Sequence, residues 1–254
     1  MDLLTRWLEA VEQRHLADLT VSEVARALRA LSSCYVERRS KLAEGGALSS
    51  AGKRAAFALF YGPQHLLITR AILKALPPAA GEVTDIVDLG CGTGAAGVAW
   101  ALASGAQAMR GIDRHPWAIA EAKWTYRQFQ LSSHVVQAHI AAPDMSGLKR
   151  TLIGARPGTG VLAAYAANEL APDGRARLLP LLLDAGAQGA RVLVVEPIAR
   201  RSLPWWSEWQ AAFEGAGGRA DEWRFPADLP PTQRALARAA GLDPRELTAR
   251  SLFL

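Results

Sequence analysis

The chain has 254 residues and a mass of 27.2 kDa, which suits one medium-sized domain with a small extension. Half of the residues are hydrophobic, and this composition excludes a wholly disordered chain. The chain has only two cysteines, Cys34 and Cys91, which is too few for a disulfide scaffold or an all-cysteine metal site. The N-terminus lacks the order of a signal peptide, and no apolar run reaches the roughly 20 residues that cross a bilayer. We therefore expect a cytoplasmic protein that makes no membrane contact.

The net charge of +5 is concentrated at the start of the chain. Residues 1–80 carry 11 basic and 7 acidic side chains, whereas residues 201–254 carry 7 of each. A basic surface attracts phosphate, so the N-terminal region is a candidate for binding RNA; the alternative is an ordinary solvated helix face. The basic residues concerned are Arg26, Arg29, Arg38, Arg39, Lys41, Lys53 and Arg54.

Residues 1–78 are expected to form a helical cap that recognises the substrate. Apolar residues recur there at helical spacing, and Thr20-Val-Ser-Glu23 fits a capping box at the start of a helix. Breaks are expected at residues 44–46 and at Gly62-Pro63, and a helix is expected over residues 64–76. Pro77–Gly81 then marks the boundary to a second domain over residues 79–254.

In this second domain, short apolar runs alternate with helical stretches. Strands are expected at 83–89, 108–112, 134–140, 160–166 and 191–196, and helices at 94–104, 116–131 and 172–187. Such alternation predicts an α/β fold with a parallel sheet covered on both faces. The tail adds a helix at 205–214, a short strand at 222–225 and a last strand at 247–254.

A glycine-rich turn follows the first of these strands, in Ile86-Val-Asp-Leu-Gly-Cys-Gly-Thr-Gly94. Gly92, Gly94 and Gly97 fit the spacing of a dinucleotide fingerprint, and Asp113 follows at the usual distance. However, a nicotinamide fold would place the first motif glycine directly after the strand. Asp88 at the strand end would also repel a pyrophosphate. The carboxylate suits a cationic ligand that carries no phosphate.

The run from Asp88 to Gly94 resembles the first motif of class I S-adenosylmethionine (SAM)-dependent methyltransferases. The resemblance covers about residues 80–254 and implies a Rossmann-like, seven-stranded, mostly parallel sheet with an antiparallel last strand. It also implies that SAM is the cofactor and that no metal is needed. By this resemblance, Gly90, Gly92 and Gly94 form the turn against the cofactor. Asp88 then faces its ammonium end, and Asp113 grips the ribose hydroxyls.

Further cofactor contacts follow from the same resemblance. Cys91 occupies the variable position of the motif and is expected to be a small loop side chain. The family packs adenine near Arg114, His115 and Trp117, although helix-start and core packing are equally open for the last two. After the third strand the family often has an acidic residue that this chain lacks. His139, Asp144 or the backbone of Ile140 are the candidates for that place.

The methyl-acceptor pocket is expected where the fourth and fifth strands end, because the carboxyl ends of parallel strands meet in one crevice. Asn168 is a candidate to bind the acceptor or the amino end of the cofactor. Glu169 or Glu196 is a candidate to accept a proton from the attacking group. The alternative for each is helix capping or a polar strand terminus.

Aromatic side chains provide candidate acceptor contacts. Trp205, Trp209 and Phe213 follow helical spacing and are expected to be core, which leaves Trp206 as the more exposed stacking candidate. Tyr61 and His65 precede the second domain and are candidate lid contacts over the pocket; packing at a helix junction is the alternative.

A more distant resemblance concerns the acceptor. Tyr61-Gly-Pro63, Ala167-Asn-Glu-Leu170 and Val194-Val-Glu-Pro197 are similar to segments of the small-ribosomal-subunit methyltransferase-like family known from mitochondria. This resemblance implies a ribosomal RNA or ribosome-linked substrate, but the cysteine-rich segment of that family is missing. The alternatives are a small planar metabolite as acceptor, or a SAM-binding ribosome assembly factor without turnover. The sequence does not give the oligomeric state.

Overall fold

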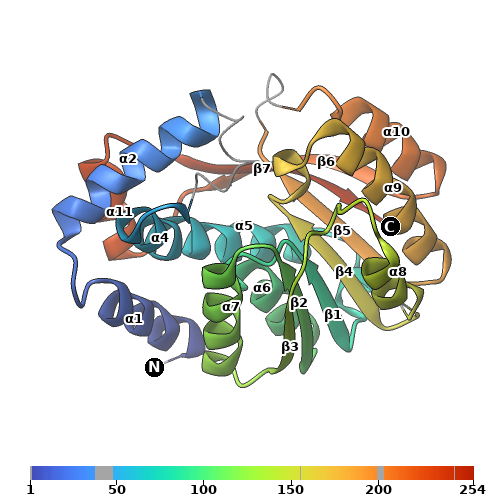
Figure 1. Cartoon of the computed structure of the whole chain (residues 1–254), viewed down its shortest axis with the longest axis horizontal. Helices are drawn as coiled ribbons and strands as arrows, with labels where there is room; N and C mark the ends of the chain where they lie inside the picture. The colour runs from blue at the N-terminus through green and yellow to red at the C-terminus, as the bar shows by residue number, and fades with distance from the viewer. Residues whose placement is uncertain (1, 38–47, 155, 199–202, 243) are drawn as a thin grey trace.

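A computed structural model describes residues 2–37, 48–154, 156–198, 203–242 and 244–254, and its centre is one seven-stranded sheet (Figure 1). The strand order is β3-β2-β1-β4-β5-β7-β6. The strands are β1 (Asp85–Leu89), β2 (Ala108–Asp113), β3 (Ser132–Gln137), β4 (Thr159–Ala164), β5 (Arg191–Glu196), β6 (Arg219–Pro226) and β7 (Glu246–Phe253). Strands β1 to β5 are parallel, and β7 runs antiparallel to both β5 and β6. The predicted Rossmann-like fold is confirmed.

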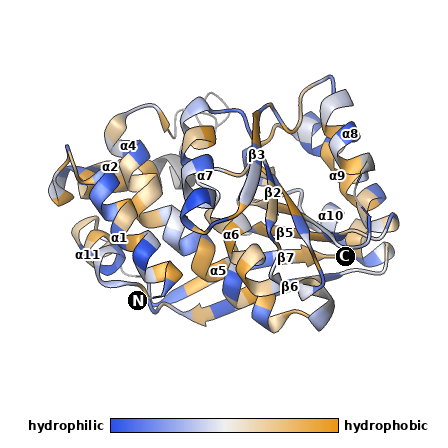
Figure 2. Cartoon of the chain, turned by 90° about the horizontal axis from the view of Figure 1, so that it is seen from below, coloured by the Kyte–Doolittle hydropathy of each residue, from blue (hydrophilic) through white to orange (hydrophobic). Residues whose placement is uncertain are grey.

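Helices cover both faces of the sheet. One face carries α5 (Gly62–Ala75), α6 (Ala95–Ser104) and α7 (Pro116–Gln128); the other carries α8 (Ser146–Ile153), α9 (Pro172–Ala187) and α10 (Trp206–Gly215). Neighbouring strand residues point to opposite faces, so Ile86 joins one apolar cluster and Val87 the other. Figure 2 shows hydrophobic residues on α5 and α6, which pack against each other on the first face.

The N-terminal helices are α1 (Leu3–His15), α2 (Val21–Glu37) and α4 (Ala51–Ala56). The capping box of α2 is confirmed, because Glu23 accepts a hydrogen bond from the backbone of Thr20 at 2.8 Å and its own amide donates to the Thr20 hydroxyl. Helix α1 is fixed to α7 by Glu121, whose buried carboxylate pairs with Arg14 at 2.8 Å and with His15 at 3.1 Å. The N-terminal helices therefore lie against the domain that carries the sheet.

The expected break at Gly62-Pro63 is wrong, because the chain stays helical from α4 to α5. A π-helical turn, η2 (Phe57–Tyr61), joins the two helices, and the Gly62 amide donates to the carbonyl of Phe57. Pro63 has no amide hydrogen, but it stands in the first turn of α5, where that donor has no helical partner. A Cβ atom on Gly62 would lie 3.1 Å from the Thr93 hydroxyl, so glycine brings the helix close to the glycine-rich turn.

Other differences from the expected elements are small. Strand β3 ends at Gln137 rather than residue 140, and β6 is longer than the four residues expected. Helix α8 was not expected, and α11 (Pro231–Ala239) packs against α2. One apolar cluster runs from α1 and α2 to the sheet, while the division of the chain at residue 78 stays a prediction. Within the described ranges, none of the helices combines the length and hydropathy needed to cross a membrane.

Candidate active site

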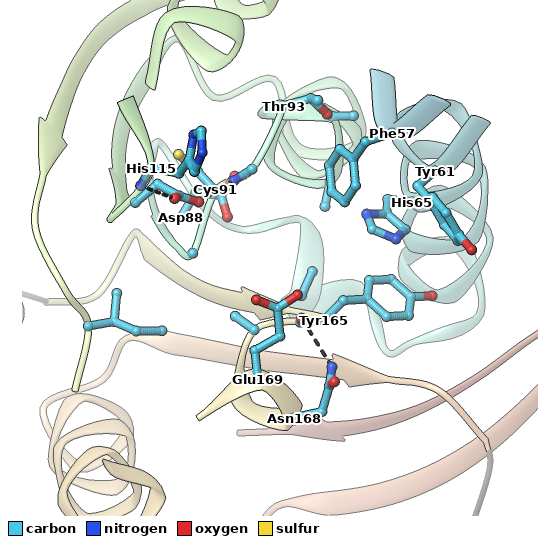
Figure 3. A pocket seen from close by; sticks show the side chains of 18 of the residues that line it. Phe57, Tyr61, His65, Asp88, Cys91, Thr93, His115, Tyr165, Asn168 and Glu169 are labelled. Atoms are coloured by element: carbon cyan, nitrogen blue, oxygen red, sulfur yellow. Dashed lines mark hydrogen bonds between the residues drawn. The ribbon is translucent and has the colours of Figure 1, made fainter. Parts of the chain in front are cut away.

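A pocket of about 390 Å³ opens at the carboxyl ends of β1, β2 and β4 (Figure 3). Its floor includes the glycine-rich turn after β1, and its sides come from the segments that follow β2, β3 and β4. Residues of η2 and α5, which precede β1 in the chain, form the remaining side of the pocket. This is the place where a parallel α/β sheet forms its ligand crevice, because side chains at several strand ends converge there.

The glycine-rich turn has backbone angles that require glycine. Gly90 has φ +70° and Gly94 has φ +78°, both in the left-handed region. A Cβ atom on Gly90 would lie 2.6 Å from the Cβ of Ala166, and one on Gly94 would lie 2.7 Å from the ring of Tyr126. The turn therefore stays tight and leaves its backbone open to a ligand; Gly92, with φ +53°, is the third glycine of the predicted set and lines the pocket.

Asp113 ends β2 with its carboxylate held in a fixed orientation. Its Oδ2 accepts a hydrogen bond from the Gly92 amide at 2.9 Å, and its Oδ1 accepts one from the His115 amide at 2.8 Å. Each oxygen of an ionised carboxylate keeps a further lone pair. The carboxylate lines the pocket beside the glycine-rich turn, so it can accept two hydrogen bonds from a vicinal diol.

Asp88 lies deeper than Asp113, under the glycine-rich turn. Its side chain is 1% exposed and accepts a hydrogen bond from the Tyr126 hydroxyl at 3.1 Å. Burial raises the pKa of Asp88 to about 7, and the negative charge of Asp113 adds to this effect. Cys91 is buried next to it, and burial raises the pKa of its thiol well above the ordinary value. Cys91 is thus a neutral thiol, as expected for a small loop side chain.

The structure brings only some of the candidates for the adenine contacts to the pocket. Arg114, His139 and Ile140 line the pocket, as does His115. His139 accepts a hydrogen bond from the Ala141 amide at 3.0 Å, and burial lowers its pKa. Asp144 does not line the pocket but accepts a hydrogen bond from the Ser146 amide at the start of α8. Trp117 also stays outside the pocket, edge-on to Phe57 and His15.

Asn168 and Glu169 line the pocket on a short 3-10 turn, η4 (Ala167–Glu169), after β4. Glu169 points into the cavity and lies 4.0 Å from the guanidinium of Arg114 (Figure 3). The expectation that Glu196 also lines the pocket is wrong. Its carboxylate is fully buried behind Asn168, because η4 crosses the end of β5 and covers it. Glu196 accepts hydrogen bonds from the Asn168 backbone amide at 3.0 Å and side-chain amide at 2.5 Å, so it holds Asn168 in place.

The expected exposure of Trp206 is wrong. Trp206 is 4% exposed, and its ring packs against Trp205 at 5.8 Å and the Arg250 guanidinium at 5.5 Å. It lies away from the pocket because the start of α10 buries both neighbouring indoles between the helix and the sheet. The core interpretation of Trp205, Trp209 and Phe213 is confirmed by exposures of 8%, 1% and 0%.

An aromatic wall forms the N-terminal side of the pocket. Tyr61 and His65 line it, as expected of lid contacts, together with Phe57 and Tyr165, which the sequence analysis missed. Phe57 stands four residues before Tyr61 and eight before His65, so continued helical spacing was a usable signal. The expected break at Gly62-Pro63 hid it. Tyr165 has φ +57°, which no sequence pattern marked.

The comparisons with known proteins agree with this architecture. Residues 67–153 match the family model of the methyltransferase small domain. The mitomycin 7-O-methyltransferase MmcR has a TM-score of 0.52 and 15% identity over 100% of this chain and 72% of that chain. A candidate O-methyltransferase from Nostoc punctiforme PCC 73102 has a TM-score of 0.52 and 15% identity, over 90% and 72% of the two chains. No curated protein matches the chain.

The chain has the fold of a class I SAM-dependent methyltransferase. The match to the methyltransferase small domain begins within α5 and ends within α8, so it contains the glycine-rich turn, Asp113 and His139. It does not reach Asn168 and Glu169. The family match therefore covers the glycine-rich turn and Asp113, and the side of the pocket that Asn168 and Glu169 form lies outside it.

Proposed function

We propose that this chain is a SAM-dependent methyltransferase. The observation that carries the proposal is the Asp113 carboxylate, fixed by two backbone amides at the rim of a glycine-rich turn. A vicinal diol such as that of a ribose supplies two donors to such a carboxylate. The backbone around Gly92 is open to the same ligand.

The charges around the pocket fit SAM better than a dinucleotide. Among the described lining residues, Asp88, Asp113 and Glu169 are acidic. The guanidinium group of Arg114 also lines the pocket, and it lies 4.0 Å from the Glu169 carboxylate. Acidic side chains attract a cation and repel a pyrophosphate. SAM, when bound, supplies a methyl group on a positively charged sulfur that an acceptor heteroatom can attack.

The side chains of this pocket then have distinct tasks. Asp113 orients the ribose, and the glycine-rich turn gives the ligand close backbone contact. Asn168, held by Glu196, presents its amide at the junction of the cofactor and acceptor sides. Glu169 reaches into the cavity and is placed to accept the proton that an acceptor N–H or O–H loses. Alignment and exclusion of water supply the remaining rate enhancement.

Titration calorimetry on the full chain tests the cofactor proposal. We expect binding of SAM and of its demethylated product S-adenosylhomocysteine, and no binding of NAD. Binding of NAD without SAM would overturn the proposal. Turnover is tested separately with SAM labelled in its methyl group and cell extract, because absence of any labelled product would favour a SAM-binding assembly factor.

For the acceptor we propose a small molecule ahead of ribosomal RNA. The RNA hypothesis rests on the basic N-terminal side chains, of which Arg29 donates to the carbonyls of Ala239 and Ala240, and Arg54 to that of Leu48. Arg38, Arg39 and Lys41 lie outside the described residues. RNA binding that weakens steeply with salt would support the ribosome-linked alternative.

A further inference from the structure

We propose that the methyl acceptor is an uncharged, planar aromatic small molecule that carries an N–H or O–H group, held by the rings of Phe57, Tyr61, His65 and Tyr165. This inference rests on the proposed methyltransferase function and names the substrate class of the same pocket. Three observations lead to it: the arrangement of the rings, the uncharged state of the described N-terminal side chains that line the pocket, and the hydrogen-bonding groups beside Tyr165.

The four rings form a continuous wall from two distant segments of the chain. The centroids of Phe57 and Tyr61 lie 5.9 Å apart, and Phe57 meets His65 edge-on at 6.0 Å and 84°. His65 stacks on Tyr165 at 4.1 Å and 13°. All four rings line the cavity, and Figure 3 shows Phe57, Tyr61 and His65 on its helical side and Tyr165 beside Glu169. A further flat ring placed against this wall can stack on one member and meet another edge-on, the two arrangements that aromatic rings favour.

The same wall has no charged group. Burial lowers the pKa of His65 to about 3 and raises the pKa of Tyr61 to about 12, so both rings are neutral near pH 7. The other described lining residues that precede β1, which are Leu48, Gln64 and Ile68, are uncharged. An ionic acceptor would lose its hydration there without gaining an opposite charge.

Next to Tyr165, the pocket offers hydrogen-bond acceptors on Asn168 and Glu169. The Asn168 side-chain amide group donates to Glu196 at 2.5 Å and to the Tyr165 carbonyl at 3.1 Å. Because the Tyr165 carbonyl can only accept, it fixes the orientation of the amide, and the Asn168 oxygen is left to accept from a ligand. The Glu169 carboxylate beside it is also an acceptor. A ligand that hydrogen-bonds to the Asn168 oxygen must bring a donor, which is the N–H or O–H group whose hydrogen methylation would replace.

Four probes of one size test this class by titration calorimetry on the full chain, in the presence and absence of SAM. We expect 2-naphthol to bind. Naphthalene-2-sulfonate, which is charged, decahydro-2-naphthol, which is not flat, and 2-methoxynaphthalene, which lacks the donor, should each bind at least about tenfold more weakly. Equal affinity for all four probes, or preference for the sulfonate, would overturn the proposal.

Variants of His65 connect the binding to the aromatic wall. His65→Ala should weaken 2-naphthol binding about tenfold, while His65→Phe, which keeps the stacking ring, should retain more of the affinity than His65→Ala does. Arg70→Ala is the matched control, because Arg70 is exposed on the same helix and does not line the pocket. Thermal melting checks that each variant is folded. Unchanged 2-naphthol affinity in folded His65→Ala would refute the assignment.

The outcomes separate the acceptor class from the function on which it rests. A chain that binds SAM but not 2-naphthol would refute the aromatic subsite and leave the methyltransferase proposal intact. A chain that binds 2-naphthol but not SAM would refute the methyltransferase proposal. Labelled methyl groups from SAM should appear in the small-molecule fraction of a cell extract; incorporation that ribonuclease removes would overturn the choice of a free ring.

Discussion

Replacing Gly97 with alanine tests whether the buried carboxylate of Asp88 fixes the floor of the cofactor site. Gly97 lies inside α6, where alanine is ordinarily the better helix former by about 1 kcal/mol. Here a Cβ atom would lie 2.5 Å from Oδ2 of Asp88 and 2.7 Å from the terminal methyl of Met109. The methionine can move because its side chain is flexible, but the carboxylate is 1% exposed and bonded to Tyr126.

The magnitude follows from these two opposed effects. A displaced Asp88 carboxylate loses its hydrogen bonds to Tyr126 and to the Gly97 amide. At about 0.5–1.5 kcal/mol for each of the two hydrogen bonds, the loss totals about 1–3 kcal/mol, from which the helix gain of about 1 kcal/mol is subtracted. We therefore expect Gly97→Ala to lower the free energy of unfolding by up to about 2 kcal/mol. For a chain of this size that lowers the melting temperature by up to about 8 °C.

Thermal melting and chemical denaturation measure the change in the free energy of unfolding. Because Asp88 lies under the glycine-rich turn, we also expect Gly97→Ala to weaken SAM binding, which calorimetry measures. The matched control is Gly147→Ala, because Gly147 lies in α8 and a Cβ atom there would meet nothing within 4 Å. The control should raise the stability by up to about 1 kcal/mol, since only helix propensity acts. If Gly97→Ala stabilised the chain as the control does, Asp88 would have room to move, and its fixed position would be refuted.

Three further predictions concern single carboxylates. Asp113→Ala should weaken SAM binding at least about tenfold in calorimetry, because a charged hydrogen bond contributes about 1.5–3 kcal/mol; unchanged affinity would contradict the ribose assignment. Glu121→Gln should lower the free energy of unfolding by about 1–3 kcal/mol, because the 3% exposed carboxylate pairs with Arg14 and His15. Burial raises the pKa of Glu121, but the hydrogen bonds from His15 and Arg14 lower it overall, so this stabilisation is present above the ordinary pKa and lost in acid. An equal deficit of Glu121→Gln at pH of about 3 and about 7 would contradict this reasoning. Burial raises the pKa of Glu196 from 4.5 to about 8. The protonated side chain therefore stabilises the fold fully below the ordinary pKa of 4.5, and this stabilisation is lost as the pH rises through about 8. Urea unfolding should therefore show that the free energy of unfolding of the unmodified chain falls more steeply between pH of about 4.5 and about 8 than that of Glu196→Gln. If the free energies of the two proteins fell in parallel with pH, the buried Glu196 carboxyl group would not be the cause.

The sheet and the glycine-rich turn that lines the pocket could be predicted from local patterns along the chain. Apolar runs separated by helical stretches require a parallel sheet, and the glycines after the first strand require left-handed backbone angles. The methyltransferase resemblance assigns Asp113 to the same site, because Asp113 ends the second strand, where that family has an acidic residue. These are local signals, which depend on neighbours in the sequence and on the fixed geometry of strands, and they needed no knowledge of distant packing.

The other side of the pocket depends on contacts between elements that are distant in the sequence, which no local pattern indicates. Whether Trp206 is exposed depends on Arg250, and whether Glu196 lines the pocket depends on η4, which crosses in front of it. The stacking of His65 on Tyr165 joins segments 100 residues apart, through a π-helical turn that no apolar pattern indicated. Contacts of this kind arise from the packing of whole elements against one another, and that packing is set by side-chain shape across the fold rather than by the order of residues along one segment.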